Sequence, residues 1–481
     1  MVNRRLVVLM LVAMLVATAC GSRSSQAQKL EALRGVAGAA GGSGTGSGGD
    51  QSAAAGADLT GAASSSSGGA AGGGATGGAA AAASTGGASK TAAPAGGNGG
   101  ATDVGVTGNS LTVANVSILT GPVPGLFAGA SYGTDAFLAY QNSQGGVYGR
   151  QLKLLTGDDQ FDCGHNKALT ESYLTKAFAF VGSFSLFDNC AAQVLTANPT
   201  VPDVHNALSV DAQKEPNNFS SQPLRQGAST GPLNYFKSKA PGAVSAVGTL
   251  VGDVQSARDS WVGIRAAAES VGYKILYERT YAPTETDFTA DIVKMRNQGV
   301  KMLLLVAMDV KAAARIMKAA AGQGWKPEIT AFGASAYDPQ LVPLAGAAAL
   351  EGVWIYLPTT LYLGEDKSVN KETDLFLTWL KRTHPNAAPD LFTVYGWASA
   401  RLFVQALQAA GPKATRAGVI GALKNVHQFD ANGLLALGDP AAKQPPSCYI
   451  IARINGGNYA RVDDPPSSYR CDGAYFLKPG G

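Results

Sequence analysis

The chain has 481 residues, more than one hydrophobic core usually organises, so at least two folded lobes are expected. Its 38 basic and 34 acidic side chains leave a net charge of +4, and the two signs are mixed along the sequence. This balance argues against a basic nucleic-acid-binding surface, and we expect no nucleic-acid partner.

The first 20 residues have the pattern of a bacterial export signal. Arg4 and Arg5 precede an apolar run, 6–19, that is too short to span a bilayer and ends in small residues before Cys20. The pattern resembles a lipoprotein signal, although Ala17 stands where such signals usually have a branched apolar residue. We predict removal of residues 1–19 and lipid attachment at Cys20, on the outer face of the bacterial cell membrane. A plain secretory signal and an uncleaved anchor are the alternatives.

Residues 20–109 are predicted to form a lipidated N-terminus and a disordered tether. From about residue 35 the segment is almost entirely Gly, Ala, Ser and Thr, so it cannot bury enough apolar surface to offset the entropy of ordering. A flexible chain of about 70 residues reaches roughly 45 Å on average, far enough to hold a folded domain away from a membrane. Gly44, Gly46 and Gly49 match the spacing of a dinucleotide-binding loop, but no strand or helix flanks them, and no cofactor is expected.

The folded part opens with a strand, a helix and a second strand. The run 111–119 is almost continuously apolar, as in a strand buried on both faces of a parallel sheet. A helical pattern covers about 128–142, and the next strand leads into the loop 158–162. Because loops at the carboxyl ends of parallel strands meet at one rim of a sheet, we expect the loops 120–127 and 158–162 to lie together at a cleft.

The same residues carry a resemblance to a known family. The run ILTGPVPG from Ile118, a helix, GGVYGRQLKLL from Gly145 and the pair Asp158-Asp159 resemble the opening of the branched-chain amino-acid-binding receptors of ABC transporters, the type I periplasmic binding proteins. The likeness extends over 111–481 and rests on the order of many weak motifs. It implies an α/β fold of two doubly wound, Rossmann-like lobes joined by a three-stranded hinge. It also implies a small-molecule ligand, and a permease and an ATPase as partners.

The strand and helix pattern begins again after about residue 230, which predicts the second lobe. Lobe 1 would comprise 110–229 and 359–432, and lobe 2 would comprise 230–358 and 433–481. Three crossings would form a hinge that lets the lobes close over a ligand. The chain is expected to act as a monomer.

Four cysteines follow Cys20, and an even number in an exported chain suggests two disulfides with three possible pairings. The family resemblance implies a bridge between Cys163 and Cys190, which leaves Cys448 to pair with Cys471.

A metal site in the run DDQFDCGH is the rival interpretation of Cys163. Its ligands would be Asp158, Asp159, Asp162, Cys163 and His165. We favour the disulfide, because the cysteine has a partner and the acids follow the end of a strand, and we expect no metal.

Residues in the strand-end loops of both lobes are the candidate ligand contacts. The resemblance implies that the first lobe holds a carboxylate through backbone N–H groups and serine hydroxyls, beside apolar and aromatic side chains. The candidates in lobe 1 are Leu126, Phe127, Ser183, Phe184, Ser185, Phe187, Leu208 and Ser209. Those in lobe 2 are Asp253, Gln255, Ser256, Met308, Asp309, Ser335 and Tyr337. The alternative for each serine is a helix cap, and for each second-lobe residue a solvated loop position.

The candidate pocket departs from the amino-acid-binding members of the family. Their second-lobe glutamate, which meets the ligand's ammonium, falls on Ser335. A stacking aromatic falls on Ser256 or Ala257, and a first-lobe tryptophan falls on Leu126.

These departures predict the ligand class. Burying an ammonium without a paired charge costs several kcal/mol, so the pocket should reject zwitterions unless Asp309 or Asp253 replaces the glutamate. We therefore expect a small, mainly apolar organic acid, amide or aromatic compound rather than leucine.

The chain is not expected to be an enzyme. It has no GxSxG nucleophile elbow, and of its four histidines only His205 falls near the strand-end serines. A receptor that binds without chemistry is favoured. A ligand sensor for a signalling partner, a surface structural or adhesive protein and a hydrolase are the alternatives.

Overall fold

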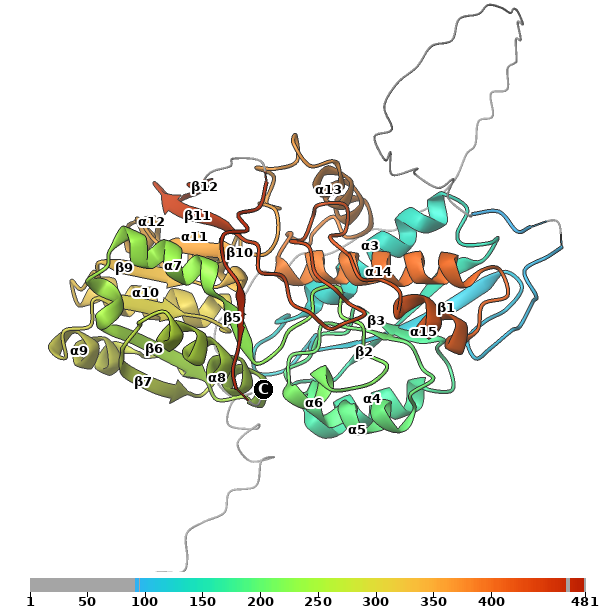
Figure 1. Ribbon diagram of the computed structural model, residues 1–481, viewed down its shortest axis with the longest axis horizontal. Coiled ribbons are helices and arrows are strands. Elements are labelled where there is room, and N and C mark those ends of the chain that lie inside the picture. Colours follow the sequence, from blue (N-terminus) through green and yellow to red (C-terminus); the bar gives the residue numbers. More distant parts are fainter. Residues whose placement is uncertain (1–90, 95, 464–467, 480–481) are drawn as a thin grey trace, which may run out of the picture. The chain divides into compact units, whose positions relative to one another are not determined.

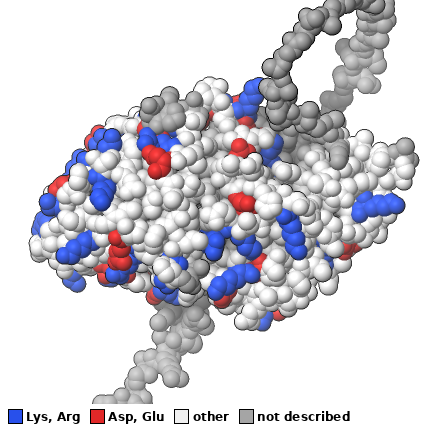
Figure 2. All heavy atoms as spheres, in the orientation of Figure 1, with Lys and Arg blue, Asp and Glu red and all other residues white. Residues whose placement is uncertain are grey.

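A computed structural model describes residues 91–94, 96–463 and 468–479, which all belong to one compact unit. The predicted signal, Cys20 and the tether up to residue 90 lie outside the described residues. Within the described ranges, no helix has the length and hydropathy needed to cross a membrane. Figure 2 shows Lys and Arg side chains singly or in small groups among uncharged atoms, with Asp and Glu close to several of them.

The first lobe contains a four-stranded parallel sheet with the strand order β2-β1-β3-β4 (Figure 1). Its strands are β1 (Ser110–Ser117), β2 (Gln151–Asp158), β3 (Ala179–Val181) and β4 (Asp203–Val204). Its helices are α3 (Ala128–Ser143), α4 (Cys163–Tyr173), α5 (Asp188–Ala197), α6 (Val210–Gln213), α13 (Lys371–Thr383), α14 (Leu391–Ala410) and α15 (Arg416–Leu423).

Both faces of this sheet are covered, which explains the continuous apolar pattern of β1. Leu111 and Val113 share a hydrophobic cluster with side chains of α3 and α14, whereas Ala114 and Val116 share another with Leu195 of α5. Successive side chains of a strand point to opposite faces, so a strand between two helical layers has no polar face.

Helix α14 lies against α3 at a distance that only glycine permits. A Cβ atom on Gly133 would lie 1.9 Å from the carbonyl oxygen of Thr393, and one on Gly396 would lie 2.1 Å from the carbonyl oxygen of Ala130. This close approach brings the start of α14 beside the loop that follows β1.

The second lobe contains a seven-stranded sheet with the order β12-β11-β10-β9-β8-β6-β7. Its strands are β6 (Val247–Gly252), β7 (Ile275–Tyr281), β8 (Met302–Leu305), β9 (Ile329–Phe332), β10 (Trp354–Leu357), β11 (Ile450–Asn455) and β12 (Asn458–Arg461). Strands β6 to β10 are parallel, and β11 and β12 add antiparallel pairs at one edge.

Helices cover both faces of this second sheet as well. They are α7 (Thr230–Lys239), α8 (Gln255–Ser270), α9 (Thr289–Asn297), α10 (Val310–Gly322), α11 (Leu341–Ala345) and α12 (Ala347–Leu350). In β8, Leu303 and Leu305 share a cluster with Ile316 of α10, whereas Met302 and Leu304 share one with Trp261 of α8. Two short strands, β5 (Gly227–Ser229) and β13 (Tyr475–Leu477), form an antiparallel pair.

Three segments lie side by side where the chain passes between the lobes. The carbonyl oxygen of Pro358 accepts hydrogen bonds from Ala436 N at 2.7 Å and from Gln222 Nε2 at 3.0 Å. The amide of Thr360 donates to Leu434 O at 3.0 Å. The structure thus has the three connections that the family resemblance implies.

The packed structure begins before residue 109, where the predicted tether ends. Arg150 is buried and donates to the carbonyl oxygens of Asn98 and Gly100, and Asp103 accepts a hydrogen bond from Arg416 N at 2.7 Å. Val106 is buried too. This stretch consists mostly of small residues. That composition gives no sign that its carbonyl groups accept hydrogen bonds from the buried guanidinium of Arg150.

Both predicted disulfides are confirmed. Cys163 is bonded to Cys190, which joins the first turns of α4 and α5, and Cys448 is bonded to Cys471.

Candidate functional site

A cavity of about 280 Å³ lies at the carboxyl ends of the parallel strands of both lobes. Lobe 1 contributes the loops after β1, β2 and β3, the loop around Leu208 and the first turn of α14. Lobe 2 contributes the residues that end or follow β6, β7, β8, β9 and β10. Ligands of doubly wound sheets bind at this edge, so the cavity is the candidate binding site.

The first-lobe wall is a cluster of aromatic rings. The ring centroid of Phe127 lies 4.7 Å from that of Phe184 and 4.6 Å from that of Phe392. Phe184 also stacks against Tyr395, with 6.2 Å between centroids. Tilted and edge-on pairs of this kind hold the rings in fixed positions, so this wall is a rigid apolar surface.

The second-lobe wall adds two tyrosines at strand ends. The hydroxyl of Tyr281 lies 3.7 Å from where a Cβ of Gly252 would be, and the hydroxyl of Tyr356 lies 3.8 Å from the corresponding point at Gly333. Burial raises the pKa of both tyrosines and of Tyr395 above the ordinary value, so all three hydroxyls are neutral. They are available to donate one hydrogen bond each.

Serines also line the cavity. Ser256 is one of them, but its Oγ atom is buried away from solvent and has no hydrogen-bond partner among the described residues. Ser335 also lines the cavity, but its hydroxyl already donates to the carbonyl oxygen of Met308 at 2.8 Å.

Charged groups are scarce around the cavity. No lysine or arginine is found among the described residues that line it, and Asp309 is the one carboxylate there. Asp309 caps α10, because its Oδ1 atom accepts a hydrogen bond from Ala312 N at 2.9 Å. The cavity therefore offers neutral hydroxyls and apolar surface.

The structure brings about half of the predicted contacts to the cavity. Those that line it are Leu126, Phe127, Phe184, Leu208, Ser256, Met308, Asp309 and Ser335. Those that do not are Ser183, Ser185, Phe187, Ser209, Asp253, Gln255 and Tyr337.

The three first-lobe serines outside the cavity bond to the protein itself. The Oγ atom of Ser183 accepts from Val116 N at 3.0 Å, and that of Ser185 donates to Asp159 Oδ2 at 2.5 Å. Ser209 caps α6 through a hydrogen bond from Ala212 N at 3.3 Å. The helix-cap alternative thus describes Ser209, and none of the three hydroxyls faces the cavity as a carboxylate ligand.

The remaining predicted contacts have partners elsewhere. Tyr337 is fully buried and donates to Glu365 Oε2 at 2.5 Å. Asp253 pairs with Arg258 at the surface, and Gln255 donates to Asp259 Oδ1 at 2.8 Å. Phe187 packs edge-on against Phe161, with 5.2 Å between ring centroids.

Sequence reasoning missed several cavity residues. They are Val123, Phe161, Leu391, Phe392, Tyr395, Tyr281 and Tyr356 among others. Tyr281 is the last residue of β7 and Tyr356 is the residue before the last in β10, and a position at the end of a strand is the one signal that could have indicated them. Phe392 and Tyr395 belong to α14, a helix of lobe 1 that follows the passage of the chain back from lobe 2. The sequence has no signal that this helix reaches the cavity.

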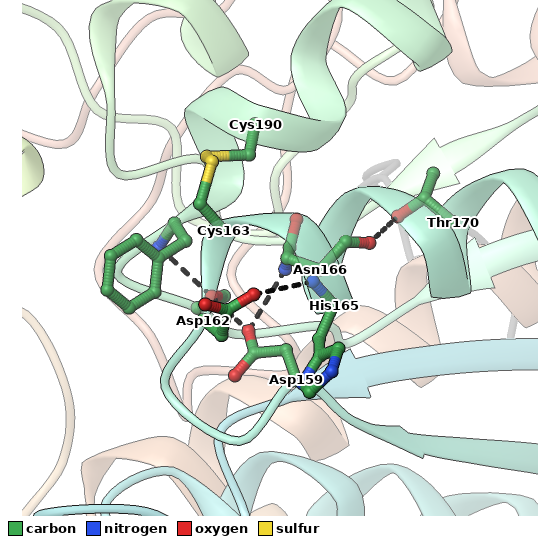
Figure 3. The surroundings of a disulfide bond; sticks show 9 residues. Asp159, Asp162, Cys163, His165, Asn166, Thr170 and Cys190 are labelled. Atoms are coloured by element: carbon green, nitrogen blue, oxygen red, sulfur yellow. Dashed lines mark hydrogen bonds between the residues drawn. A yellow bond between two sulfur atoms is a disulfide. The ribbon is translucent and has the colours of Figure 1, made fainter. Parts of the chain in front are cut away.

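The rival metal site in the run 158–165 is not formed. Figure 3 shows Cys163 bonded to Cys190 while Asp162 points to the backbone of His165, whose N–H it accepts at 2.9 Å. Asp159 accepts hydrogen bonds from Asn166 and Ser185, and Asp158 accepts one from Leu119 N. These acids are occupied in capping helices and turns.

A family model described as "Periplasmic binding protein" matches residues 110–458. The chain belongs to this family. Its members are binding proteins rather than enzymes. No curated protein sequence matched the chain.

Solved structures with the same fold share little sequence with this periplasmic binding protein. A "Fatty acid ABC transporter substrate-binding protein from Thermomonospora curvata" has 19% identity and a TM-score of 0.64, over 77% of this chain and 95% of that one. LivJ from Streptococcus pneumoniae, solved in complex with isoleucine, has 17% identity and a TM-score of 0.60, over 74% and 99%. A putative branched-chain amino acid ABC transporter protein from Rhodospirillum rubrum has 21% identity and a TM-score of 0.55, over 73% and 100%.

Proposed function

We propose that this protein is the extracytoplasmic solute-binding component of an ABC importer and that its ligand is a small, mainly apolar organic compound. The ligand class is inferred from the wall of the cavity. Four aromatic rings cluster on one side of it, and no basic side chain is found among its described residues. Burial of apolar ligand surface against such a wall is favourable by roughly 25 cal/mol per Å².

A zwitterionic amino acid suits this cavity poorly. Its carboxylate would need basic or N–H partners, and the serines expected to supply hydroxyls bond elsewhere. Its ammonium would have only Asp309, one oxygen of which already caps α10. Each buried charge without a partner costs several kcal/mol, so we expect leucine to bind weakly or not at all.

The polar groups of the cavity suit one neutral group on the ligand. The hydroxyls of Tyr281, Tyr356 and Tyr395 can bond to an amide, a hydroxyl or a protonated acid. A cavity of about 280 Å³ admits an aromatic ring or a short aliphatic chain. The similar structure that is named a fatty acid binding protein agrees with an apolar ligand of this kind.

Two hydrogen bonds between the lobes support capture by closure. Lys311 Nζ at the start of α10 donates to Pro124 O in the loop after β1 at 3.3 Å. Val210 N donates to Asp259 Oδ2 of α8 at 3.1 Å. A ligand that touches both walls would favour the state in which these bonds form.

Calorimetric titration of the full chain tests the ligand class. We would compare leucine, isoleucine and valine with benzamide, benzyl alcohol and hexanamide. The proposal expects micromolar or tighter binding of at least one of the last three and none of the amino acids. It also expects Asp309→Asn to bind that compound as the wild type does, because Asn still caps α10. The surface variant Asp253→Asn is the matched control.

Tight binding of a branched-chain amino acid that Asp309→Asn abolishes and Asp253→Asn preserves would overturn the proposed ligand class. It would show that Asp309 serves as the partner of an ammonium group.

A further inference from the structure

A buried cluster of ionisable side chains lies in lobe 1, away from the cavity wall. Asp203 and Glu215 are 0% exposed and His205 is 4% exposed. One ligand atom from each of the three lies within 4.8 Å of the others. His205 Nδ1 is 2.6 Å from Asp203 Oδ2, and Asp188 Oδ2 is 3.9 Å from the other ring nitrogen.

This cluster contains several polar atoms that have no partner among the described residues. They are Asp203 Oδ1, His205 Nε2 and both carboxylate oxygens of Glu215. Buried polar atoms are nearly always hydrogen-bonded, so a concentration of unpartnered ones in a few residues calls for a ligand. Acidic side chains that only cap helices or turns would have hydrogen-bond partners for these atoms.

The nearby lysine forms no hydrogen bond with these oxygens, although its charge acts on Glu215 and Asp203. Lys443 Nζ donates to the carbonyl oxygens of Gln213 at 3.0 Å and Glu215 at 2.6 Å, and no hydrogen bond joins it to a carboxylate of the cluster. Asp203, Glu215 and Asp188 are three acids around one histidine. Buried carboxylates in this number are paired with a cation or share protons.

We propose that Asp203, His205 and Glu215 bind a divalent metal ion of the zinc or manganese class. Such an ion holds carboxylate oxygens and an imidazole nitrogen at about 2.0 to 2.2 Å, which places its ligands about 3 to 4 Å apart. His205 Nδ1 and Asp203 Oδ2, now 2.6 Å apart, would separate to reach that spacing, and more distant pairs within the 4.8 Å limit would move closer. An imidazole ligand disfavours Mg²⁺ and Ca²⁺, which prefer oxygen.

Space for a further ligand lies beside the cluster. A cavity of about 20 Å³, room for one water molecule, is bordered by Asp203, His205 and Asp188. A water there completes the coordination of an ion bound by three side chains. Asn218 Nδ2 donates to Asp203 Oδ2 at 2.8 Å and fixes the orientation of that carboxylate.

The site supports the wall of the ligand cavity. Asp188 Oδ2 accepts a hydrogen bond from the amide of Leu208 at 2.6 Å, and Leu208 lines the cavity. An ion bound between β4 and Glu215 clamps both ends of the segment that carries Leu208. Its role is structural, and it does not depend on which compound the cavity binds.

The test is the metal content and thermal stability of the full chain, purified without a histidine tag. Elemental analysis should find about one equivalent of zinc or manganese. Chelation by EDTA should lower the Tm by several degrees, and Zn²⁺ or Mn²⁺, but not Ca²⁺, should restore it. Glu215→Gln and His205→Gln should each weaken binding of the added metal by more than about tenfold.

His427→Gln is the matched control. His427 pairs with Asp439 at the surface, 3.0 Å away, and lies outside the buried cluster, so this variant should keep the metal and the EDTA response.

A proton shared by Glu215 and Asp203 is the competing explanation of the unpartnered oxygens. Glutamine imitates a protonated glutamate, so in that case Glu215→Gln keeps the wild-type Tm and the wild-type chain binds no Zn²⁺ or Mn²⁺. That result overturns the proposal, and so does metal binding that survives both Glu215→Gln and His205→Gln.

Discussion

The rings of Phe127 and Phe392 lie 4.6 Å apart between centroids, although one follows β1 and the other begins α14. Their contact depends on the close approach of α3 and α14 at Gly133 and Gly396. The apolar wall of the cavity is therefore assembled by the return of the chain from the second lobe.

Truncation of this wall should weaken ligand binding. Phe392→Ala removes a ring that touches both Phe127 and Phe184, so we expect at least a tenfold loss of affinity for the apolar ligand, or about 1.4 kcal/mol. Calorimetric titration measures it. Phe187→Ala, which removes a ring outside the cavity, is the control, and equal losses in the two variants would contradict this assignment of the wall.

Stability should fall as the pH rises from about 4 to 7. Burial raises the pKa of Asp390 to about 7 and that of Asp338 to about 6, above the values near 3.9 of an unfolded chain. In this window the folded state holds more protons than the unfolded state. The contribution of these groups to the free energy of unfolding is therefore complete below about pH 4 and is lost as the pH rises through their folded pKa values.

Urea unfolding at several pH values checks this sign. Asp390→Asn keeps the cap that Asp390 forms with Thr393 N and removes its titration, so the variant should lose less stability between pH 4 and 7 than the wild type. Asp162→Asn, at the exposed cap of α4, should retain the wild-type slope. An unchanged slope in Asp390→Asn would show that this acid does not titrate as described.

Loss of the bridge between α4 and α5 should destabilise the first lobe. The double variant Cys163→Ser, Cys190→Ser should cost about 2 to 4 kcal/mol of unfolding free energy, because the unfolded chain gains freedom. Denaturant unfolding of this variant and of the wild type measures the difference. Wild-type stability without the bridge would rule out that contribution.

Lipidation of Cys20 stays a prediction, because that residue lies outside the described ranges. The apolar run before it and the small residues at 17–19 predict processing by the lipoprotein pathway. Globomycin should cause the precursor to accumulate, and Cys20→Ser should release the protein from membranes. Normal processing in both cases would point instead to a plain secretory signal.

The sequence predicted the parts of the fold that have a regular hydrophobic pattern. The predicted strand 111–119 and helix 128–142 correspond to β1 (Ser110–Ser117) and α3 (Ala128–Ser143), because burial on two faces leaves a continuous apolar run and burial of one stripe leaves a helical period. The pairing of Cys163 with Cys190 followed from the family resemblance.

The candidate site was harder to predict, because a strand-end position does not fix the direction of a side chain. Ser183 and Ser185 follow a strand as expected, yet backbone and carboxylate partners hold them inside the lobe. The aromatic residues of α14 reach the cavity through helix packing that has no local signal. His205 was considered beside serines, whereas its partners are Asp203 and Asp188.

Small-angle X-ray scattering of the full chain, with and without a saturating apolar ligand found by calorimetry, tests whether the two lobes close over an apolar ligand. The radius of gyration should be smaller with ligand, because the compound is held by walls from both lobes. Leucine at the same concentration should leave the curve unchanged. Tight binding of the apolar compound without any compaction would rule out capture by closure.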